Sequence, residues 1–350
     1  MSQKQNQVIL ITGASGFIAT HIVRDFLHAG YHVRGTVRSS ATAELVRQSF
    51  SQFAPQLSLV IVNDMSKPGA FDEAVQGVQG VIHTASPFQV FNVEDNERDL
   101  LRPAIDGTIN ILTSVFTHAP EVKRVVITSS FAAMLDISKG SWPGHVYSEA
   151  DWNMTPYEVA AAKGAPAGLA YSTAKALAEH AAWDFVKTNK PNFDIATIMP
   201  PMVYGPNINA TANLAKLNTS SADIYRLVSY QTKSSDDVPQ NMFWSFVDVR
   251  DVSTAHLRAY EVLEAGGERF FLCAGNFTYQ RFVDALRERI PEIQDRVPIG
   301  NPGTGTVPSS VYTINNTKSQ KILGIQYHKL EDTVVDAARS LLKLEGSLPK

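Results

Sequence analysis

Short runs of aliphatic residues alternate with longer amphipathic stretches over the first two hundred residues of the chain. The apolar runs predict six strands, at residues 8–11, 32–37, 57–62, 80–83, 125–128 and 195–199. The stretches between them carry apolar residues at helical spacing and predict helices that include residues 17–29, 42–53, 97–118 and 171–190. Apolar strands separated by helices are typical of a parallel sheet covered on both faces. The pattern therefore predicts an α/β fold of the Rossmann type, a doubly wound parallel sheet with ligands at the carboxyl ends of its strands.

The regular alternation ends after Pro200. The later residues predict a helix near 222–230, a strand and then a helix within 245–263, an apolar run at 269–274, and a helix near 279–290. We expect one Rossmann domain whose late segments leave it and rejoin it. The predicted division is a Rossmann domain of residues 1–199 and 244–264, and a smaller C-terminal lobe of residues 200–243 and 265–350.

Composition and charge are those of a folded protein with no global affinity for polyanions. Hydrophobic residues make up 44% of the 350 residues and charged residues 19%, which excludes an intrinsically disordered chain. Lys and Arg total 31 against 34 Asp and Glu, a formal net charge of -3, so we expect no nucleic-acid or membrane partner. The polar residues 1–7 and the short apolar run after them predict neither a signal peptide nor a membrane span. A cytoplasmic protein is expected, monomeric or homodimeric.

Cysteine and histidine usage argues against metal or thiol chemistry. The one cysteine, Cys273, has no partner for an intramolecular disulfide, and its apolar neighbours predict a small core residue. The nine histidines include no HExxH motif, and the one HxxxH pair, His28 and His32, spans the break between the helix predicted at 17–29 and the strand predicted at 32–37. We therefore expect no metal site.

A glycine turn follows the first predicted strand and opens the first predicted helix. The segment is Thr12-Gly13-Ala-Ser15-Gly16-Phe17-Ile18-Ala19. Gly13 permits the tight turn, and Gly16 lets backbone N–H groups approach a pyrophosphate at the positive end of the helix. Ala19 replaces a third glycine and is small enough for close helix–strand packing. This arrangement predicts a dinucleotide site.

The second predicted strand indicates which dinucleotide is bound. An acidic residue near its end would hold the ribose 2′-hydroxyl of NAD, whereas an arginine accommodates the 2′-phosphate of NADP. No acidic residue lies between Asp25 and Glu44, and the segment carries Arg34 and Arg38. Arg38 lies just past the strand, where a guanidinium can grip a phosphate, so NADPH is the predicted cofactor.

A tyrosine and a lysine four residues apart lie on the helix predicted at 171–190. This spacing puts the Tyr171 phenol and the Lys175 ammonium on one helix face. A carbonyl that becomes an alkoxide needs a proton donor, and a cation about 4 Å from a phenol in a partly dry site could lower the phenol pKa by about 3. Ser130 follows the fifth strand, at the same sheet edge as the glycine turn, where a hydroxyl can bond a substrate carbonyl.

These residues together resemble an extended short-chain dehydrogenase/reductase. Within that superfamily, the segments His83-Thr-Ala-Ser-Pro-Phe88, Thr128-Ser-Ser130 and Asp248-Val-Arg-Asp-Val252 resemble the dihydroflavonol-reductase-like group and its fungal carbonyl reductases. The resemblance covers essentially the whole chain. It implies NADPH-dependent reduction of aldehydes and ketones, with Ser130, Tyr171 and Lys175 as catalytic residues and Tyr171 as proton donor.

The resemblance also implies a set of cofactor contacts. Arg38 would bind the 2′-phosphate, Asp64 and Met65 would flank the adenine, and Tyr171 and Lys175 would reach the nicotinamide ribose. The remaining expected contacts are Gly13, Ser15, Gly16, Phe17, Ile18, Thr84, Ala85, Ser86, Pro200, Val203 and Ser220. The family pattern has a lysine where this chain has Thr42, so one phosphate contact of the family is missing.

The substrate pocket is expected beside these groups, between the Rossmann domain and the substrate-binding lobe. Its predicted lining is Phe88, Phe131, Gly168, Met202 and Tyr204. Such a lining is apolar and suits small carbonyl compounds with aliphatic or aromatic groups. The family pattern carries valine at Gly168, so this position predicts room for a bulkier substituent.

Two other functions remain open from the sequence. A nucleotide-sugar epimerase or dehydratase of the same superfamily would use NAD and need a basic cluster for a diphosphate, for which residues 200–243 offer only Lys216, Arg226 and Lys233. A non-catalytic NADP-sensing protein would keep the glycine turn. It would have no reason to retain Ser130, Tyr171 and Lys175, so their presence favours an enzyme.

Overall fold

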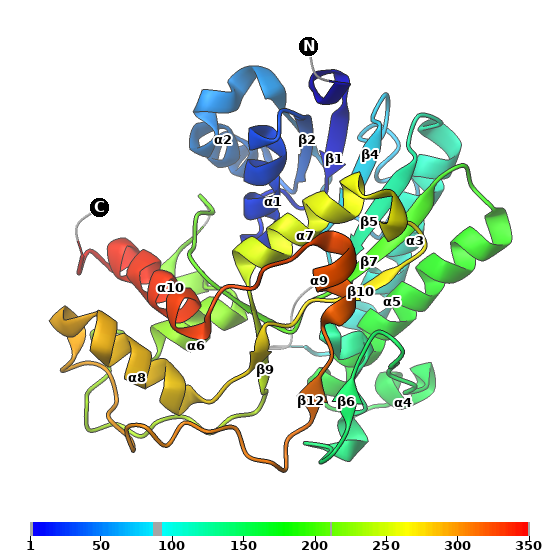
Figure 1. Ribbon diagram of the computed structural model, residues 1–350. Helices are drawn as coiled ribbons and strands as arrows, with labels where there is room; N and C mark the ends of the chain where they lie inside the picture. The colour runs from blue at the N-terminus through cyan, green and yellow to red at the C-terminus, as the bar shows by residue number, and fades with distance from the viewer. Residues whose placement is uncertain (1–2, 87–92, 211, 349–350) are drawn as a thin grey trace.

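A seven-stranded parallel sheet forms the centre of the computed structural model, which describes residues 3–86, 93–210 and 212–348 (Figure 1). The strand order across the sheet is β3–β2–β1–β4–β5–β7–β10. The strands are β1 (Val8–Ile11), β2 (His32–Val37), β3 (Leu57–Ile61), β4 (Gly80–His83), β5 (Arg124–Thr128), β7 (Asp194–Met199) and β10 (Arg269–Phe271). The chain winds outward from β1 to β3 and then returns to β4 on the other side of β1. Ligands of such sheets bind at this switch point, beyond the carboxyl ends of β1 and β4.

The predicted doubly wound α/β fold is confirmed, and the sheet has one strand more than expected. The additional strand, β10, pairs with β7 in parallel, Phe270 opposite Ile198. Its three residues lie within the range that the sequence assigned to the lobe, so the predicted boundary at residue 265 does not follow the sheet. The rest of the predicted division stays a prediction.

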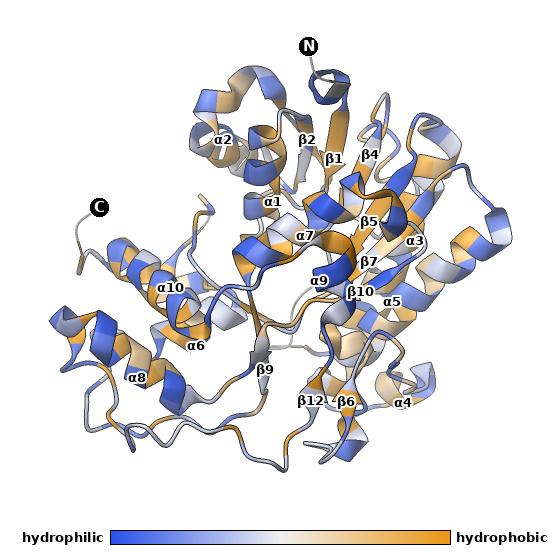
Figure 2. Cartoon of the chain, in the orientation of Figure 1, coloured by the Kyte–Doolittle hydropathy of each residue, from blue (hydrophilic) through white to orange (hydrophobic). Residues whose placement is uncertain are grey.

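Helices cover both faces of the sheet because its strands are apolar on both sides. In β1, Ile9 and Ile11 pack with helices α1 and α7, while Leu10 packs on the opposite face with α3. Figure 2 shows the sheet strands as mainly hydrophobic and the helices as mixed. The helices of this layer arrangement are α1 (Phe17–His28), α2 (Ser40–Ser49), α3 (Arg102–His118), α5 (Ala167–Asn189) and α7 (Val249–Glu261). A π-helical turn, Glu97–Leu101, precedes α3, where the sequence predicted one continuous helix.

The lobe has a small sheet and a core of its own. Strands β8 (Met202–Tyr204), β9 (Ser245–Asp248) and β11 (Gly275–Asn276) form a three-stranded sheet. Its helices are α6 (Thr219–Tyr225), α8 (Tyr279–Arg289) and α10 (Leu330–Glu345), whose apolar residues share one buried cluster. Helix α10 was not predicted from the sequence. Strand β9 was predicted to belong to the Rossmann domain, but it pairs with β8 and β11 in the small sheet.

Four further short elements complete the helices and strands named here. They are α4 (Tyr157–Ala161), α9 (Thr317–Leu323), β6 (Val146–Tyr147) and β12 (Thr313–Ile314). Among them α9 packs against α7 and β10. The two short strands pair with each other in parallel. Behind them an aromatic cluster forms around Phe131, which stacks on Phe271 at 4.9 Å and meets Tyr147 edge-on.

Candidate active site

The predicted functional residues gather at one edge of the large sheet. The glycine turn follows β1, Arg38 follows β2, Thr84 follows β4, Ser130 comes two residues after β5, and Pro200 follows β7. Because these strands are parallel, their carboxyl ends all meet at the same edge. The fold therefore brings these predicted residues, which are far apart along the chain, to one edge of the sheet.

The turn after β1 is built for close approach of another group. Gly13 has a φ of +68°, and a Cβ at this position would lie 3.3 Å from the Cα of Ala85. The Gly13 N–H donates to the Thr36 hydroxyl at 3.0 Å, and the Ala14 N–H donates to the Thr36 carbonyl at 2.9 Å. Gly16 is the N-cap of α1 and supplies no side-chain cap, so the N–H groups of the first helical turn are available to an anion. The predicted contacts Ser15, Phe17 and Ile18 belong to this turn and helix start.

The buried hydroxyl of Thr12 links the ends of β1 and β4, a role that was not predicted from the sequence. The Thr12 Oγ1 atom accepts from the backbone N–H groups of Thr84 and Ala85, each at 3.0 Å. It lies 3.0 Å from His83 Nδ1. Burial lowers the pKa of His83 to about 3, so the ring is neutral and accepts the Thr12 proton. Thr12 thus holds the predicted contacts Thr84, Ala85 and the adjacent Ser86 beside the glycine turn.

Arg38 is exposed beyond the end of β2, whereas the Arg34 side chain is held by backbone carbonyls. The Arg34 guanidinium donates to the carbonyls of Ala74 and Gln76, at 3.0 Å and 2.6 Å, and therefore fixes a turn. In the described part of the chain the Arg38 guanidinium makes no hydrogen bond. It contributes to the lowered pKa of Asp64, which is due first to hydrogen bonds from Ser66. Of the two arginines, Arg38 has its side chain available for a phosphate.

The predicted adenine contacts lie between β3 and α3. The Asp64 carboxylate accepts from the Ser66 N–H at 3.0 Å, which shapes a turn, and the Met65 carbonyl accepts from the Asn110 side chain at 3.0 Å. A cavity of about 500 Å³ adjoins this turn. Its lining is Ser66, Asp95, Glu97, Arg98, Arg102, Pro103 and Asp106.

The three predicted catalytic residues lie together. Ser130 begins a short 3-10 turn (Phe131–Ala133), and its hydroxyl accepts from the Ala132 N–H at 3.1 Å. The Tyr171 phenol hydrogen-bonds to Ser130. Lys175 is 8% exposed and donates from Nζ to the Thr128 carbonyl at 3.1 Å. A phenol, a hydroxyl and an ammonium therefore meet where β5 ends against α5.

The pKa of Tyr171 differs from the prediction. Burial raises it to about 12, and the hydrogen bond with Ser130 offsets this only in part. The sequence predicted the opposite direction, from a lysine about 4 Å away. That prediction is wrong for this structure because burial of the phenol outweighs the hydrogen bond with Ser130, and the Lys175 ammonium, bound to the Thr128 carbonyl, does not contribute to the pKa of Tyr171.

The predicted pocket residues divide into open and packed positions. Gly168 lies in the first turn of α5, three residues before Tyr171, and a Cβ there would meet nothing within 4 Å. Phe131 and Tyr204 are 5% and 1% exposed and belong to packed cores. The Tyr204 hydroxyl donates to Asp223 at 2.6 Å. Met202 is partly buried, and Phe88 lies outside the described residues.

The remaining predicted cofactor contacts follow β7. The Pro200 carbonyl accepts from the Phe131 N–H at 2.9 Å, which joins the ends of β5 and β7. Val203 is a buried residue of β8, and the Ser220 hydroxyl in α6 accepts from the Asn218 side chain at 2.9 Å. These contacts position Pro200, Val203 and Ser220 in the fold. That the three residues bind a cofactor stays a prediction.

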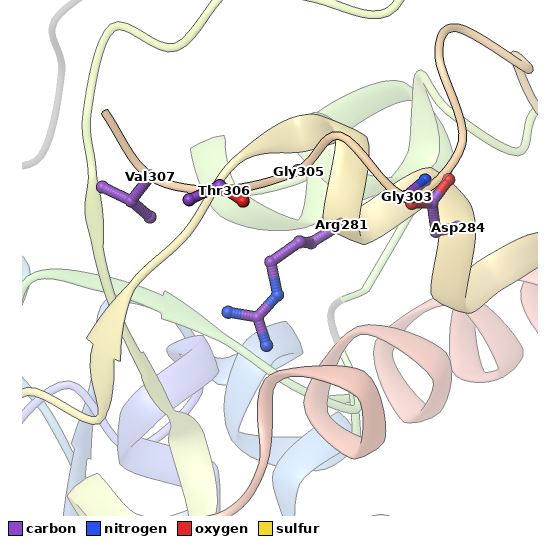
Figure 3. A pocket seen from close by; sticks show the side chains of 6 residues that line it. All are labelled: Arg281, Asp284, Gly303, Gly305, Thr306 and Val307. Atoms are coloured by element: carbon purple, nitrogen blue, oxygen red, sulfur yellow. Dashed lines mark hydrogen bonds between the residues drawn. The ribbon is translucent and has the colours of Figure 1, made fainter. Parts of the chain in front are cut away.

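A second cavity, of about 440 Å³, lies in the lobe, away from the tyrosine and lysine (Figure 3). Figure 3 shows Arg281 projecting from α8 into the space beside the segment of residues 303–307. The cavity is lined by Arg281, Asp284, Gly303, Gly305, Thr306 and Val307. The Arg281 guanidinium is already paired with Glu331 at 2.6 Å, so the cavity offers no free cation from this residue.

Metal and thiol chemistry find no support in the described residues. Among them no three His, Cys, Asp or Glu side chains lie close enough together to hold a metal ion. Burial raises the pKa of the Cys273 thiol to about 12, which leaves it protonated and unreactive at neutral pH. No described helix is both long and apolar enough to cross a bilayer.

Comparison with known proteins places the chain in a family. Residues 9–273 match the NAD dependent epimerase/dehydratase family. The Aspergillus niger ketoreductase azaE is 39% identical over 341 residues, which are 96% of this chain and 97% of that protein. The Saccharomyces cerevisiae NADPH-dependent methylglyoxal reductase GRE2 is 36% identical over 348 residues, 97% of this chain and 99% of that protein.

The fold comparison agrees with the sequence comparison. The crystal structure of yeast methylglyoxal/isovaleraldehyde reductase Gre2 complexed with NADPH matches with a TM-score of 0.90 and 36% identity, over 98% of this chain and 100% of that chain. The chain belongs to the NAD dependent epimerase/dehydratase family, the extended short-chain dehydrogenases/reductases. The predicted resemblance is thereby confirmed.

Proposed function

We propose that this protein is an NADPH-dependent carbonyl reductase that converts aldehydes and ketones to alcohols. The observation that carries the proposal is the hydrogen-bonded pair of Tyr171 and Ser130, with Lys175 one helical turn away, at the same sheet edge as the glycine turn. A nucleotide-binding turn supplies a place for a reductant, and a buried phenol beside a hydroxyl suits protonation of an alkoxide.

The residues of the groove fit an NADP cofactor. Gly13, with a positive φ and no Cβ to crowd Ala85, forms the tight turn that precedes α1, and the uncapped start of α1 offers N–H donors to a pyrophosphate. Arg38 is exposed at the end of β2, where an NAD-specific acid would otherwise stand. Yeast GRE2 is named NADPH-dependent, and its crystal structure is complexed with NADPH, which agrees with this fit. When bound, NADPH supplies the hydride.

Each catalytic side chain has a distinct task in the proposed reaction. The Ser130 hydroxyl donates to the substrate carbonyl oxygen and orients it. The Tyr171 phenol, kept protonated by burial, donates its proton to the same oxygen as negative charge develops there. The Lys175 ammonium, held in place by the Thr128 carbonyl, would bind the nicotinamide ribose.

The substrates that we propose are small carbonyl compounds with aliphatic or aryl groups. The relatives act on a ketone and on methylglyoxal or isovaleraldehyde, as their names state. Gly168 lies three residues before Tyr171 and is exposed, with open space where a Cβ would lie, so larger substituents are expected to fit there. A cytoplasmic location and a monomer or homodimer stay predictions.

The epimerase and sensor alternatives have less support. Arg226, one of three basic residues available for a sugar diphosphate, is paired with Asp223 at 2.6 Å and lies over the Tyr279 ring. A non-catalytic sensor does not need the Tyr171–Ser130 pair. The relatives at 36–39% identity are named reductases.

The test is an NADPH-oxidation screen with the purified protein over short aldehydes, diketones and aryl ketones, with NADH in parallel. The proposal predicts carbonyl-dependent oxidation of NADPH and an alcohol product identified by gas chromatography. Absence of turnover with every carbonyl class, in protein that binds NADPH, would refute the enzyme and leave the sensor.

A further inference from the structure

A buried carboxylate on α5 has no task in the reaction as described so far. Glu179 is 2% exposed, and it follows Lys175 by four residues and Tyr171 by eight. This spacing places the three side chains along one face of the helix. An ionised carboxylate in such a position must be matched by donors, since an unpaired buried charge is strongly destabilising.

Both oxygens of the Glu179 carboxylate are fully bonded. Oε2 accepts from the Ser129 hydroxyl at 2.5 Å, and Oε1 accepts from the Thr197 hydroxyl at 2.8 Å. Arg269 donates from Nε to Oε1 at 2.8 Å, and the Trp183 indole donates to Oε1 at 3.3 Å. The carboxylate therefore has one largely buried guanidinium and three neutral donors as hydrogen-bond partners.

These donors connect the catalytic helix to three neighbouring strands. Ser129 directly follows β5, Thr197 lies in β7, and Arg269 is the first residue of β10. The three strands are adjacent in the sheet, in the order β5, β7 and β10. Glu179 therefore fixes the rotation and the height of α5 on this part of the sheet.

The same bonds connect the two halves of the catalytic pair. Ser129 precedes Ser130, whose hydroxyl meets the Tyr171 phenol. Glu179 thus restrains Ser130 through its neighbour on the strand end and restrains Tyr171 through the shared helix. A small rotation of α5 would separate the phenol from the hydroxyl, and displacements of this kind are costly for catalysis.

Glu179 is also the negative charge nearest to Lys175 along the helix. Burial lowers the pKa of the Lys175 ammonium, and the charge of Glu179 raises it again. The other groups that face Lys175 are neutral: the buried His83 on β4, and the Tyr171 phenol. The Thr128 carbonyl accepts from Lys175, while the Thr128 hydroxyl bonds to the neutral His256 of α7 at 2.7 Å.

We propose that Glu179, held by Arg269, is a positioning residue of the active site: it aligns Tyr171 with Ser130 and is the negative charge nearest to Lys175 along the helix. This inference rests on the proposed carbonyl reduction and deepens it. It assigns to β10 the role of carrying the counter-charge of the catalytic helix, in an arginine whose side chain is only 11% exposed.

The first test is Glu179→Gln, which keeps the shape and removes the charge. We expect kcat at neutral pH to fall about tenfold or more, with the alkaline limb of kcat displaced downward by roughly one pH unit, because Lys175 loses its proton earlier. A second readout needs no substrate or cofactor: NMR titration of ε-13C-labelled lysine, with Lys175 assigned through Lys175→Arg, should show the same downward displacement. The matched control is Glu345→Gln, a carboxylate 7% exposed at its side chain and paired with Arg296 in the lobe. It should lower thermal stability and leave the pH profile unchanged.

The second test is Ser129→Ala, which removes one bond of Glu179 and keeps the ion pair. We expect kcat to fall severalfold with an unchanged alkaline limb and an unchanged KM for NADPH, as a positioning effect implies. If Glu179→Gln does not fold, judged by circular dichroism, Ser129→Ala decides by itself. Wild-type kcat in Ser129→Ala, or a pH profile that moves equally in Glu345→Gln, would overturn the inference. Failure of the proposed function looks different, since the wild-type protein would then oxidise no NADPH.

Discussion

Replacing Thr12 by valine tests the connection between the glycine turn after β1 and residues 84–85 after β4. The Thr12 hydroxyl is fully buried, accepts from the N–H groups of Thr84 and Ala85, and donates to the neutral His83 ring. Valine has the same shape and none of these bonds. The two N–H donors and the imidazole acceptor would lose their common partner at the switch point between β1 and β4.

The structure sets the expected size of the effect. An unsatisfied buried polar group costs about 1–3 kcal/mol, and the two N–H groups are only partly buried, so Thr12→Val should lower the free energy of unfolding by about 2–4 kcal/mol. Because Ala85 lies against Gly13, a displaced Ala85 should also weaken NADPH binding about tenfold. Urea unfolding at pH 7 and fluorescence titration with NADPH measure the two quantities.

Thr12→Ser is the matched control, since it keeps the hydroxyl and loses only a methyl group. It should stay within about 1 kcal/mol of wild type and bind NADPH normally. If valine and serine at this position give the same stability and the same NADPH affinity, the Thr12 hydroxyl does not connect the ends of β1 and β4 as argued, and this reasoning is refuted.

Three further expectations follow from the site. Arg38→Ala should raise the KM for NADPH far more than that for NADH, measured by steady-state kinetics; equal losses would refute its phosphate role. Gly168→Val should lower kcat/KM for an aryl ketone about tenfold and leave methylglyoxal nearly unchanged; a uniform loss would show that the space beside Tyr171 does not select substrate. Acid should destabilise the fold, since burial lowers the pKa of His21 and His256 to about 4 each and that of His83 to about 3. Their stabilisation is complete above pH 6.5 and is lost as the pH falls toward 4, by about 1.4 kcal/mol per histidine per pH unit. Urea unfolding at pH 7 and pH 5.5 checks this, and equal free energies would contradict it.

The large sheet was predictable because its strands are short apolar runs between amphipathic helices. The six predicted strands differ from the observed bounds by at most one residue at an end, and the glycine turn has its predicted place between β1 and α1. Strand β10 was not predicted as part of the large sheet, because three residues carry too little periodicity to show which sheet they join. The helix α10 lies in a C-terminal stretch to which the pattern analysis assigned no element, although its apolar residues are buried in the lobe.

The candidate site was predictable as a set of residues and less so as a set of charges. Spacing and strand order brought Ser130, Tyr171 and Lys175 to one edge. Burial, which a sequence does not display, reversed the expected direction of the Tyr171 pKa. Glu179 had a usable signal, a carboxylate one turn after Lys175, but its partner Arg269 lies 90 residues further along the chain. Only the fold brings that pair together.

Tyr171→Phe tests the central claim most directly, because it removes one oxygen from the proposed proton donor. Stopped-flow and steady-state oxidation of NADPH with a good carbonyl substrate should show kcat lower by about a hundredfold or more, while fluorescence titration shows unchanged NADPH binding. Near-normal turnover in Tyr171→Phe, with the same alcohol product, would contradict the assignment of Tyr171 as the proton donor.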